Sequence, residues 1–436
     1  MVTLKIKIYN MGKLIIALVF TLAIAFTACA NDSTKNETTK NTVSTLKLPA
    51  GFTATLFTTN AGRARHIVVN TNGDVYVKLE RLKDGKGILR LRDTNSDGIA
   101  DETISFGNFG GTGIAIKNGY LYASSDAEVF RYKFNKNNEI ENPDAPELIV
   151  TGLVNKRQHA SKSITLDDKG NIYVNIGAPS NACQETDRTA GSPGQTPCPI
   201  LETAGGIWQF KVDKLNQTYA DGIRYATGLR NVVGLDWNFL ANELYVTMHG
   251  RDQMNQLHPT KFTPEQNAEL PAEEFFLVKK GMDFGWPYCY YDPIQKKKVL
   301  GPEYGGDGIM EAQCSSKEKP LYAFPAHWGP NALLFYTGDK FGEKYKNGAF
   351  IAFHGSWNRS PLKQGGYNIV FLPMKDGKPS GEYEIFADNF AGGDQNLNPA
   401  SANHRPCGLA MDSNGALYIS DDKGGAIFKI TYTGTK

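Results

Sequence analysis

The sequence predicts an all-β protein folded as a six-bladed β-propeller. A hydrophobic strand, a turn with Gly or Asn, and a second strand, usually with an aromatic residue, recur six times along the 436 residues. A hairpin that cannot bury both faces must stack on its neighbours, so six repeats predict six blades. The 45 glycines and 11 % aromatic residues suit short strands joined by tight turns. The second strands are predicted at 74–77, 120–122, 171–174, 243–246, 349–352 and 416–419.

The first 28 residues have the pattern of a signal peptide. Lys5, Lys7 and Lys13 precede an apolar run that is shorter than the ~20 residues a membrane-spanning helix needs. The run ends at Cys29 in a sequence that resembles a bacterial lipoprotein cleavage site, so we expect Cys29 to be lipidated. A cleaved, soluble secretory signal is the alternative. Residues 29–46 are then a lipid-anchor cysteine and flexible tether, and residues 47–436 the propeller. We expect an exported protein, either periplasmic or a cell-envelope lipoprotein.

Charge excludes one class of partner. The formal net charge of +2 becomes −1 once the three lysines of the first 28 residues are removed, because that segment contains no acid. No basic stripe is present, so we expect no nucleic-acid partner.

Cysteine spacing predicts two disulfides. Cys183 and Cys198 bracket a loop rich in Pro, Gly and Ser, and Cys289 and Cys314 bracket another long insertion. Export makes disulfides permissible, and each pair would contribute roughly 3 kcal/mol by restricting the unfolded chain. Cys407 is left unpaired, and we expect it to be a small buried hydrophobe rather than a catalytic thiol.

Polar residues collect at one end of the predicted propeller. In an antiparallel hairpin the start of the first strand and the end of the second lie at the same edge. Five of the seven histidines, and several arginines, flank these positions. A single histidine there could simply bond to a strand end, but a whole ring is better explained by function on a rigid scaffold. The flanking residues include Arg65, His66, His159, Arg230, Asn231, His249, Gly250, Arg251, His354, Gly355, His404 and Arg405.

These residue types predict a pocket for a flat polyanion. Guanidinium groups bind carboxylates or phosphates as a planar fork, and glycine lets a ligand approach the backbone closely. Trp328 and Trp357 lie near the same end and could stack on a planar ring or pack at the rim. A histidine beside such a pocket suits the role of general base, since its unperturbed pKa lies near neutrality.

Four motifs carry a family resemblance: Tyr225–Asn231, Phe284–Pro287, His354–Arg359 and Arg405–Ala410. With them the chain resembles, from about Leu48 to its end, the soluble pyrroloquinoline quinone (PQQ)-dependent sugar dehydrogenases. The similarity is to the branch that includes L-sorbosone dehydrogenase and fungal pyranose dehydrogenases. The resemblance implies a six-bladed propeller with PQQ over the channel and a cation, usually Ca²⁺, bridging the quinone to the protein.

The resemblance also implies roles for individual residues. His159 would be the general base, and Arg230 would assist catalysis while holding quinone oxygens. A glutamine, Gln158, stands where the glucose-oxidising branch has an acid, which argues against glucose as the substrate. Backbone carbonyls at Gly250 and Arg251 would bind the metal. The expected cofactor-binding residues are Arg65, Arg230, Asn231, His249, Arg359, His404 and Arg405.

Two further segments offer oxygen ligands for calcium. Residues Asp93–Asp101 alternate oxygen ligands like the start of an EF-hand loop, but Ile104 occupies the position of its bidentate glutamate, so a hairpin turn is the alternative. Glu273 and Glu274 could supply ligands to a structural calcium site, or they could lie at the solvated end of a loop.

The leading functional hypothesis is hydride transfer to PQQ from a sugar or sugar aldehyde, at C1 of an aldose or in a sorbosone-like substrate. Electrons would pass to an external acceptor, a cytochrome or membrane quinone, because no Cys-x-x-Cys-His haem motif is present. The alternatives are a calcium-dependent, lactonase-type hydrolase, which would need an acidic metal cage at the channel, and a non-catalytic carbohydrate-binding propeller.

Overall fold

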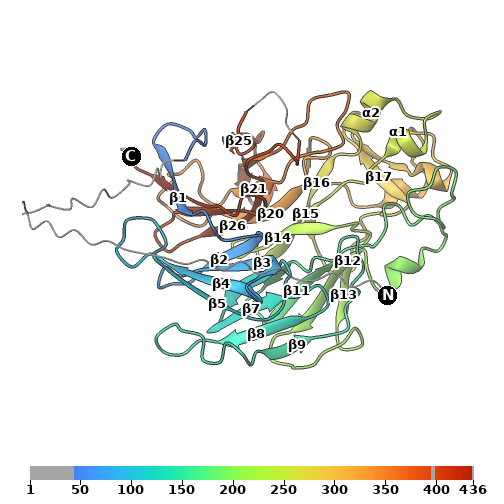
Figure 1. The fold of residues 1–436 in the computed structure, drawn as a ribbon. Coiled ribbons are helices and arrows are strands. Elements are labelled where there is room, and N and C mark those ends of the chain that lie inside the picture. Colours follow the sequence, from blue (N-terminus) through green and yellow to red (C-terminus); the bar gives the residue numbers. More distant parts are fainter. Residues whose placement is uncertain (1–43, 394–397, 435–436) are drawn as a thin grey trace, which may run out of the picture. The chain divides into compact units, whose positions relative to one another are not determined.

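The computed structural model describes residues 44–393 and 398–434. Within them the strands form six four-stranded antiparallel sheets and two small hairpins. The six sheets are the blades of a propeller, which confirms the fold predicted from the repeats (Figure 1). The predicted signal peptide, the lipidation candidate Cys29 and residues up to 43 lie outside the described part of the chain.

Each blade runs from an inner strand to an outer strand in the order given below. Blades 1 to 3 are β2 (Ala64–Val69), β3 (Val75–Lys83), β4 (Lys86–Arg92), β5 (Glu102–Phe106); β6 (Ile114–Lys117), β7 (Tyr120–Ser124), β8 (Val129–Lys133), β9 (Glu147–Val150); and β10 (Ile164–Leu166), β11 (Asn171–Ile176), β12 (Gly206–Lys211), β13 (Ile223–Thr227). Blades 4 to 6 are β14 (Val232–Asn238), β15 (Glu243–Met248), β16 (Glu273–Val278), β19 (Tyr322–Phe324); β20 (Pro330–Phe335), β21 (Ala349–Phe353), β22 (Asn368–Leu372), β25 (Glu384–Ala387); and β26 (Pro406–Met411), β27 (Leu417–Asp421), β28 (Ile427–Tyr432), β1 (Phe52–Thr58).

The inner strands close a ring. Neighbouring inner strands contact one another from β2 through β6, β10, β14, β20 and β26 back to β2. The sixth blade is completed by β1, the first strand in the described part of the chain, which pairs with β28 near the C-terminus. This pairing joins the two ends of the propeller sequence, so the ring has no open blade.

The repeated aromatic residue fills the space between blades. The six equivalents, Tyr76, Tyr122, Tyr173, Tyr245, Phe350 and Tyr418, are all at most 2 % exposed. Tyr173 of blade 3 stacks on Trp237 of blade 4, with ring centroids 5.2 Å apart, and Tyr245 packs edge-on against Phe335 of blade 5. The second strands therefore bury both faces, because every blade is covered by a neighbour on each side.

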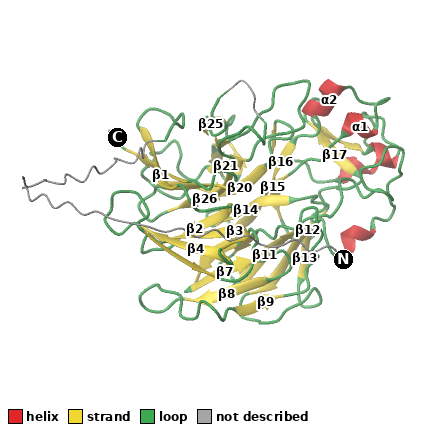
Figure 2. Ribbon diagram, viewed as in Figure 1, coloured by secondary structure: helices red, strands yellow, loops and turns green. Residues whose placement is uncertain are grey.

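The two ends of the ring differ. We call the end at which the inner strands begin the upper end, and the other the basal end. The upper end carries the insertion with helices α1 (Met254–Leu257) and α2 (Pro264–Glu269), against which the hairpin β17 (Cys289–Asp292) and β18 (Lys297–Leu300) packs. Figure 2 shows these helices grouped beside β17. The basal end carries a smaller hairpin, β23 (Met374–Lys375) and β24 (Lys378–Pro379).

Both predicted disulfides are confirmed, Cys183–Cys198 and Cys289–Cys314. They cross-link the two long connections that contain the short 3-10 turns Pro199–Glu202, Pro302–Tyr304 and Ala312–Ser316. Cys407 is free and buried, as predicted, and burial raises the pKa of its thiol to about 12. None of the described helices has the length and apolar character needed to cross a bilayer.

Candidate active site

A cavity of about 200 Å³ lies at the upper end of the propeller. Its wall comes from residues just before the inner strands β10, β14, β20 and β26 and just after the second strands β15 and β21. These distant segments meet at one end of the propeller, as the antiparallel pairing of the strands predicts. The lining residues are His159, Arg230, His249, Gly250, Asp252, Glu273, His327, Gly329, His354, Gly355, Trp357, Asn358 and Arg405.

His159 is held in one orientation and one tautomer. Its backbone is in the left-handed region, with φ of 54°, and its Nδ1 atom is hydrogen-bonded to the carbonyl of Ala178. A carbonyl only accepts, so Nδ1 carries the hydrogen and Nε2 keeps its lone pair. Burial, followed by the nearby charge of Arg230, lowers the pKa of His159 to about 3. The imidazole is therefore neutral and can accept a proton at Nε2.

Arg230 is buried at the base of the cavity and points its guanidinium at the loop after β15. Nη1 donates to the carbonyl of Gly250 (2.9 Å), and Nη2 donates to the carboxylate of Asp252 (3.1 Å) and to Asn181 (3.0 Å). Burial lowers the pKa of Arg230. The neighbouring Asn231 has a buried Oδ1 atom with no hydrogen-bond partner among the described residues.

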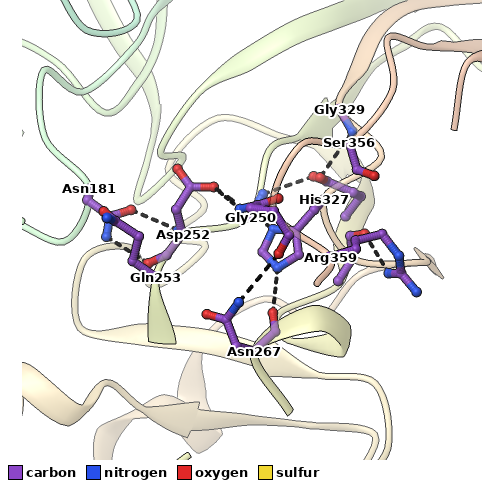
Figure 3. Close-up of polar contacts among 12 residues, drawn as sticks. Asn181, Gly250, Asp252, Gln253, Asn267, His327, Gly329, Ser356 and Arg359 are labelled. Atoms are coloured by element: carbon purple, nitrogen blue, oxygen red, sulfur yellow. Dashed lines mark hydrogen bonds and ion pairs between the residues drawn. The ribbon is translucent and has the colours of Figure 1, made fainter. Parts of the chain in front are cut away.

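Asp252 joins several parts of the site. Its carboxylate also accepts from Arg188 (3.1 Å) and Asn358 (2.9 Å) and lies 3.9 Å from Nδ1 of His327. Figure 3 shows it beside Gly250 and His327. Burial opposes ionisation, but the positive charges of Arg230 and Arg188 outweigh it and hold the pKa of Asp252 below its ordinary range. Sequence reasoning missed this residue because a lone Asp two positions after a glycine gives no periodic signal.

His327 and His249 are fixed by backbone carbonyls. Nε2 of His327 lies 2.8 Å from the carbonyl of Asn267 in α2 (Figure 3), and Nε2 of His249 lies 3.0 Å from that of Pro330. Both Nε2 atoms are therefore donors. Burial lowers the pKa of both histidines, that of His249 to about 4. They line the cavity as neutral, oriented rings.

Arg405 closes the other side of the cavity. Its Nε and Nη2 atoms donate to the carbonyls of His354 (2.9 Å) and Gly355 (3.0 Å). His354 in turn bonds through Nε2 to Asp422 (2.7 Å), and the same carboxylate is ion-paired with Arg65 (2.8 Å). A Cβ atom on Gly355 would come within 2.3 Å of the Tyr367 ring, so this position excludes any side chain.

Three predicted cofactor residues lie outside the cavity lining and contact protein groups instead. Arg65 pairs with Asp422, and His404 bonds through Nδ1 to Asp421 (2.6 Å). Arg359 donates to the carbonyls of Ala268 (2.8 Å) and Ala326 (2.9 Å), which ties α2 to the loop before His327. Each is connected to a lining residue through one intervening residue. Asn231 likewise adjoins the lining without belonging to it.

The two tryptophans have different environments. Trp357 lines the cavity and remains 58 % exposed, so it connects the cavity to the surface. Trp328 instead packs edge-on against Phe353 and Tyr383, which is the rim packing that was the alternative.

Oxygen atoms suited to a hard cation border the cavity beside Gly250. The carboxylate of Glu273 accepts from the backbone N–H groups of Gly250 (2.9 Å) and Gly329 (3.2 Å), and burial raises its pKa to about 8. The side chain of Arg251 binds Glu303 through both terminal nitrogens, and Arg251 is not among the residues that line the cavity. Glu274 is buried against Lys298 (3.0 Å) and is not at a solvated loop end.

The lining charges favour an anion. Arg230 and Arg405 contribute two positive charges and Asp252 one negative charge, while Glu273 and the buried histidines are neutral near pH 7. Asn358 adds a buried Oδ1 atom with no partner among the described residues. The donors, neutral acceptors and glycine-lined wall fit a flat, polar, anionic guest with a cation beside it.

The Asp93–Asp101 segment is a loop between β4 and β5 held by its own side chains. Asp101 accepts from the backbone of Thr94 (2.8 Å), Asp97 from that of Ile99 (2.8 Å), and Asp93 from that of Gly98 (2.8 Å). These bonds are those of an Asp- and Asn-rich turn. No group of three or more His, Cys, Asp or Glu side chains arranged for a metal ion occurs in residues 44–393 and 398–434.

The fold and cavity define a propeller with an anion-accepting site at its upper end, and comparisons identify its family. The chain matches the family described as TrAA12-like over residues 46–433 and therefore belongs to it. A pyrroloquinoline quinone-dependent sugar dehydrogenase of Hypocrea jecorina (strain QM6a) is 23 % identical over 429 residues, which cover 90 % of this chain and 92 % of that relative. The resemblance inferred from the four motifs is thus confirmed.

Solved structures agree on the fold. The calcium structure of the Trichoderma reesei family AA12 enzyme has a TM-score of 0.72 and 21 % identity, covering 90 % of this chain and 98 % of that one. The holo PQQ domain of pyranose dehydrogenase from Coprinopsis cinerea has a TM-score of 0.71 and 19 % identity, covering 88 % and 97 %. At these identities the likeness supports the six-bladed architecture.

Proposed function

We propose that this protein is a PQQ- and Ca²⁺-dependent dehydrogenase that oxidises a sugar or sugar aldehyde in the upper cavity. The observation that carries the proposal is the placement of a neutral His159, with its Nε2 lone pair available, in the same cavity as Arg230 and Arg405. The relatives named as PQQ-dependent sugar dehydrogenases supply the cofactor and substrate class. The site residues supply matching charge and a base.

His159 is the proposed general base. Its Nε2 atom takes the proton of the substrate hydroxyl, while the Ala178 carbonyl keeps hydrogen-bonding Nδ1–H and so holds the ring in place. The bound quinone supplies the two-electron acceptor for the hydride that leaves the same carbon. Arg230 stabilises negative charge on the oxygens beside it. Burial is the main cause of the low pKa of His159 and persists with a guest bound, but a bound polyanion would offset the smaller contribution from the positive charge of Arg230 and so make the imidazole a stronger base.

We propose that Arg230, Asn231, His249 and Arg405 hold the cofactor directly. Arg65, Arg359 and His404 would act on it through their partners: Arg65 through Asp422, which orients His354, and His404 through Asp421, which accepts from the backbone N–H of Arg405. Arg359 fixes the carbonyl of Ala326, next to His327.

The proposed cation site uses the backbone carbonyls of Gly250 and Arg251. The carboxylates of Asp252 and Glu273 line the same cavity and would balance the charge of the ion. A divalent cation near Glu273 would favour its ionised form. Neutral in the metal-free protein, Glu273 would then release a proton on metal binding.

We further propose export, with Cys29 as the lipid attachment site and an external cytochrome or membrane quinone as electron acceptor. The two disulfides support export, because such bonds persist in oxidising compartments.

The proposal is tested by reconstitution. Purified protein is mixed with CaCl₂ and PQQ, and quinone absorbance and dye reduction are followed with a panel of aldoses and aldehydes. A shifted quinone spectrum with sugar-dependent dye reduction is expected. Lactone hydrolysis without quinone would favour the hydrolase alternative, and sugar binding with neither activity would favour a binding propeller. Either result would contradict the proposal.

A further inference from the structure

The basal end of the propeller presents a surface that combines exposed apolar side chains with lysines. Leu240 is 75 % exposed and Phe239 is 48 % exposed in the turn between β14 and β15. The side chain of Asn238 accepts from the backbone N–H groups of Leu240 (3.0 Å) and Ala241 (2.9 Å), so this turn has a fixed shape. Lys117 covers part of the Phe239 ring, with its ammonium 4.1 Å from the ring centroid, so Leu240 is the more open of the two side chains and the first candidate for contact with an apolar layer.

A groove of about 640 Å³ adjoins this turn. Four lysines and two carboxylates are among its lining residues, so it carries an excess of positive charge. Lys375 and Lys378 face each other across the β23–β24 hairpin, are exposed, and have no ion-pair partner in the described part of the chain. Tyr245 of blade 4 donates to the carbonyl of Gly377 (2.7 Å) and so fixes this hairpin beside the turn. We call Phe239, Leu240, Lys279, Lys346, Lys375 and Lys378 the basal patch.

The point at which the described chain begins adjoins the same surface. The backbone N–H of Ser44 donates to Ala54 of β1, near Phe52 at the start of that strand. The Phe52 ring lies 4.8 Å from that of Phe341 and 5.5 Å from that of Tyr345, in the basal loop between β20 and β21. Lys346 of the basal patch is the next residue of that loop. Ser44, the first described residue, therefore lies on the basal side of the propeller, near the loop that carries Lys346.

We propose that the basal patch docks on an anionic membrane surface, which leaves the catalytic cavity at the upper end facing away from the bilayer. Lysines are attracted to the negative headgroups, and the Phe and Leu of the turn enter the interfacial layer. Ser44 is fifteen positions after Cys29, a span of at most about 50 Å when extended. The docking goes beyond the proposed dehydrogenase activity and needs only the folded propeller, although the proposed lipid anchor would hold the patch close to the bilayer.

The first test measures vesicle binding without the lipid. Residues 29–436 with Cys29→Ser are sedimented with vesicles of phosphatidylcholine, with and without phosphatidylglycerol. Binding is expected only with phosphatidylglycerol, and it should weaken as salt rises. Lys375→Glu/Lys378→Glu should weaken it at least tenfold, since each lysine near an anionic surface contributes roughly fivefold. Leu240→Glu should weaken it as well.

The matched control is Ile294→Glu, which changes a side chain 66 % exposed on the β17–β18 hairpin of the upper end. It should leave vesicle binding unchanged, and all variants should keep the sugar oxidation rate of the parent, which separates this proposal from that of function. Equal loss with Ile294→Glu, or equal binding to both vesicle types, would overturn the proposal.

A second measurement tests orientation. The chain with Cys29 intact is coupled to maleimide-lipid vesicles, and exposed lysines are acetylated and quantified by mass spectrometry. Lys375 and Lys378 should be protected relative to the free protein, whereas Lys296 of the upper end should not. Protection of Lys296 alone, or of neither group, would show that the patch does not face the bilayer. Preferential capture of an acidic protein without vesicle binding would also contradict the proposal.

Discussion

The carboxylate of Asp187 accepts a hydrogen bond of 2.7 Å from the side-chain amide of Gln158, the residue immediately before His159. Asp187 belongs to the loop closed by the Cys183–Cys198 disulfide. The sequence indicates that glutamine at this position orients the histidine but adds no charge. The structure shows that an acid, Asp187, is nevertheless present: it lies on a different segment of the chain and is hydrogen-bonded to this glutamine.

Asp187→Asn is expected to loosen Gln158 and so the loop that fixes His159. Turnover should fall roughly tenfold, since small misplacements of a catalytic group are costly, while PQQ affinity changes less than twofold. Steady-state kinetics and a quinone titration check this. Glu185→Gln, an exposed change on the same loop, is the control and should have no effect. If both variants lost turnover equally, the cause would be the loss of negative charge from the loop and not the loss of the contact with Gln158.

His159→Gln removes the proposed base but keeps a polar side chain of similar reach. Turnover should fall by roughly 10² to 10⁴, the usual range for a general base, while the quinone still binds. Single-turnover reduction of bound PQQ separates chemistry from binding. If binding and turnover fall together, His159 has a structural role instead.

Asp252→Asn should destabilise the fold as well as the site. The substitution leaves the buried guanidinium of Arg230 without its carboxylate, and breaking one partner of a buried pair costs roughly 3–5 kcal/mol. Urea unfolding measures the loss. Asp168→Asn, at an exposed carboxylate paired with Lys117, should change the free energy of unfolding by less than about 1 kcal/mol. Similar values for both variants would contradict the central place given to Asp252.

Asp236 gives a pH dependence that is separate from the site. It lines a channel cavity of about 280 Å³, and burial raises its pKa to about 7, although the backbone N–H of Phe335 donates to it (2.9 Å). The unfolded chain loses this proton near pH 4, so stability should fall as pH rises from about 4 to 7 and then level off. Asp236→Asn should remove that slope in unfolding experiments. A slope unchanged in the variant would mean that other groups cause it.

The sequence was sufficient for the fold, the ring of strand ends and both disulfides. These follow from the period of the hairpins and from loop spacing, which are local properties. It could not establish which way each polar side chain points. Arg65 and Arg359 stand at the expected end of their strands, yet their guanidinium groups bind Asp422 and two backbone carbonyls.

The missed residues share one physical cause. Asp252 and Asp187 reach the site from insertions, where no repeat indicates direction, and Glu273, which the sequence suggests only as a structural calcium ligand, reaches it from a third strand. Their contribution depends on packing between segments far apart in sequence, such as the approach of the disulfide loop to Gln158. The sequence contains only a weak signal for these residues. They are acids that lie close to the predicted cation-binding carbonyls and to the loop closed by a disulfide.

The most direct test of the proposed function is a crystal structure of the protein with PQQ and Ca²⁺. The account predicts that the quinone lies in the upper cavity, with its oxygens within hydrogen-bond reach of Arg230 and Arg405. Nε2 of His159 should face the open side above the quinone ring, and the cation should lie on the carbonyl of Gly250. A quinone bound elsewhere, or a cavity in which these three side chains cannot contact one guest, would contradict it.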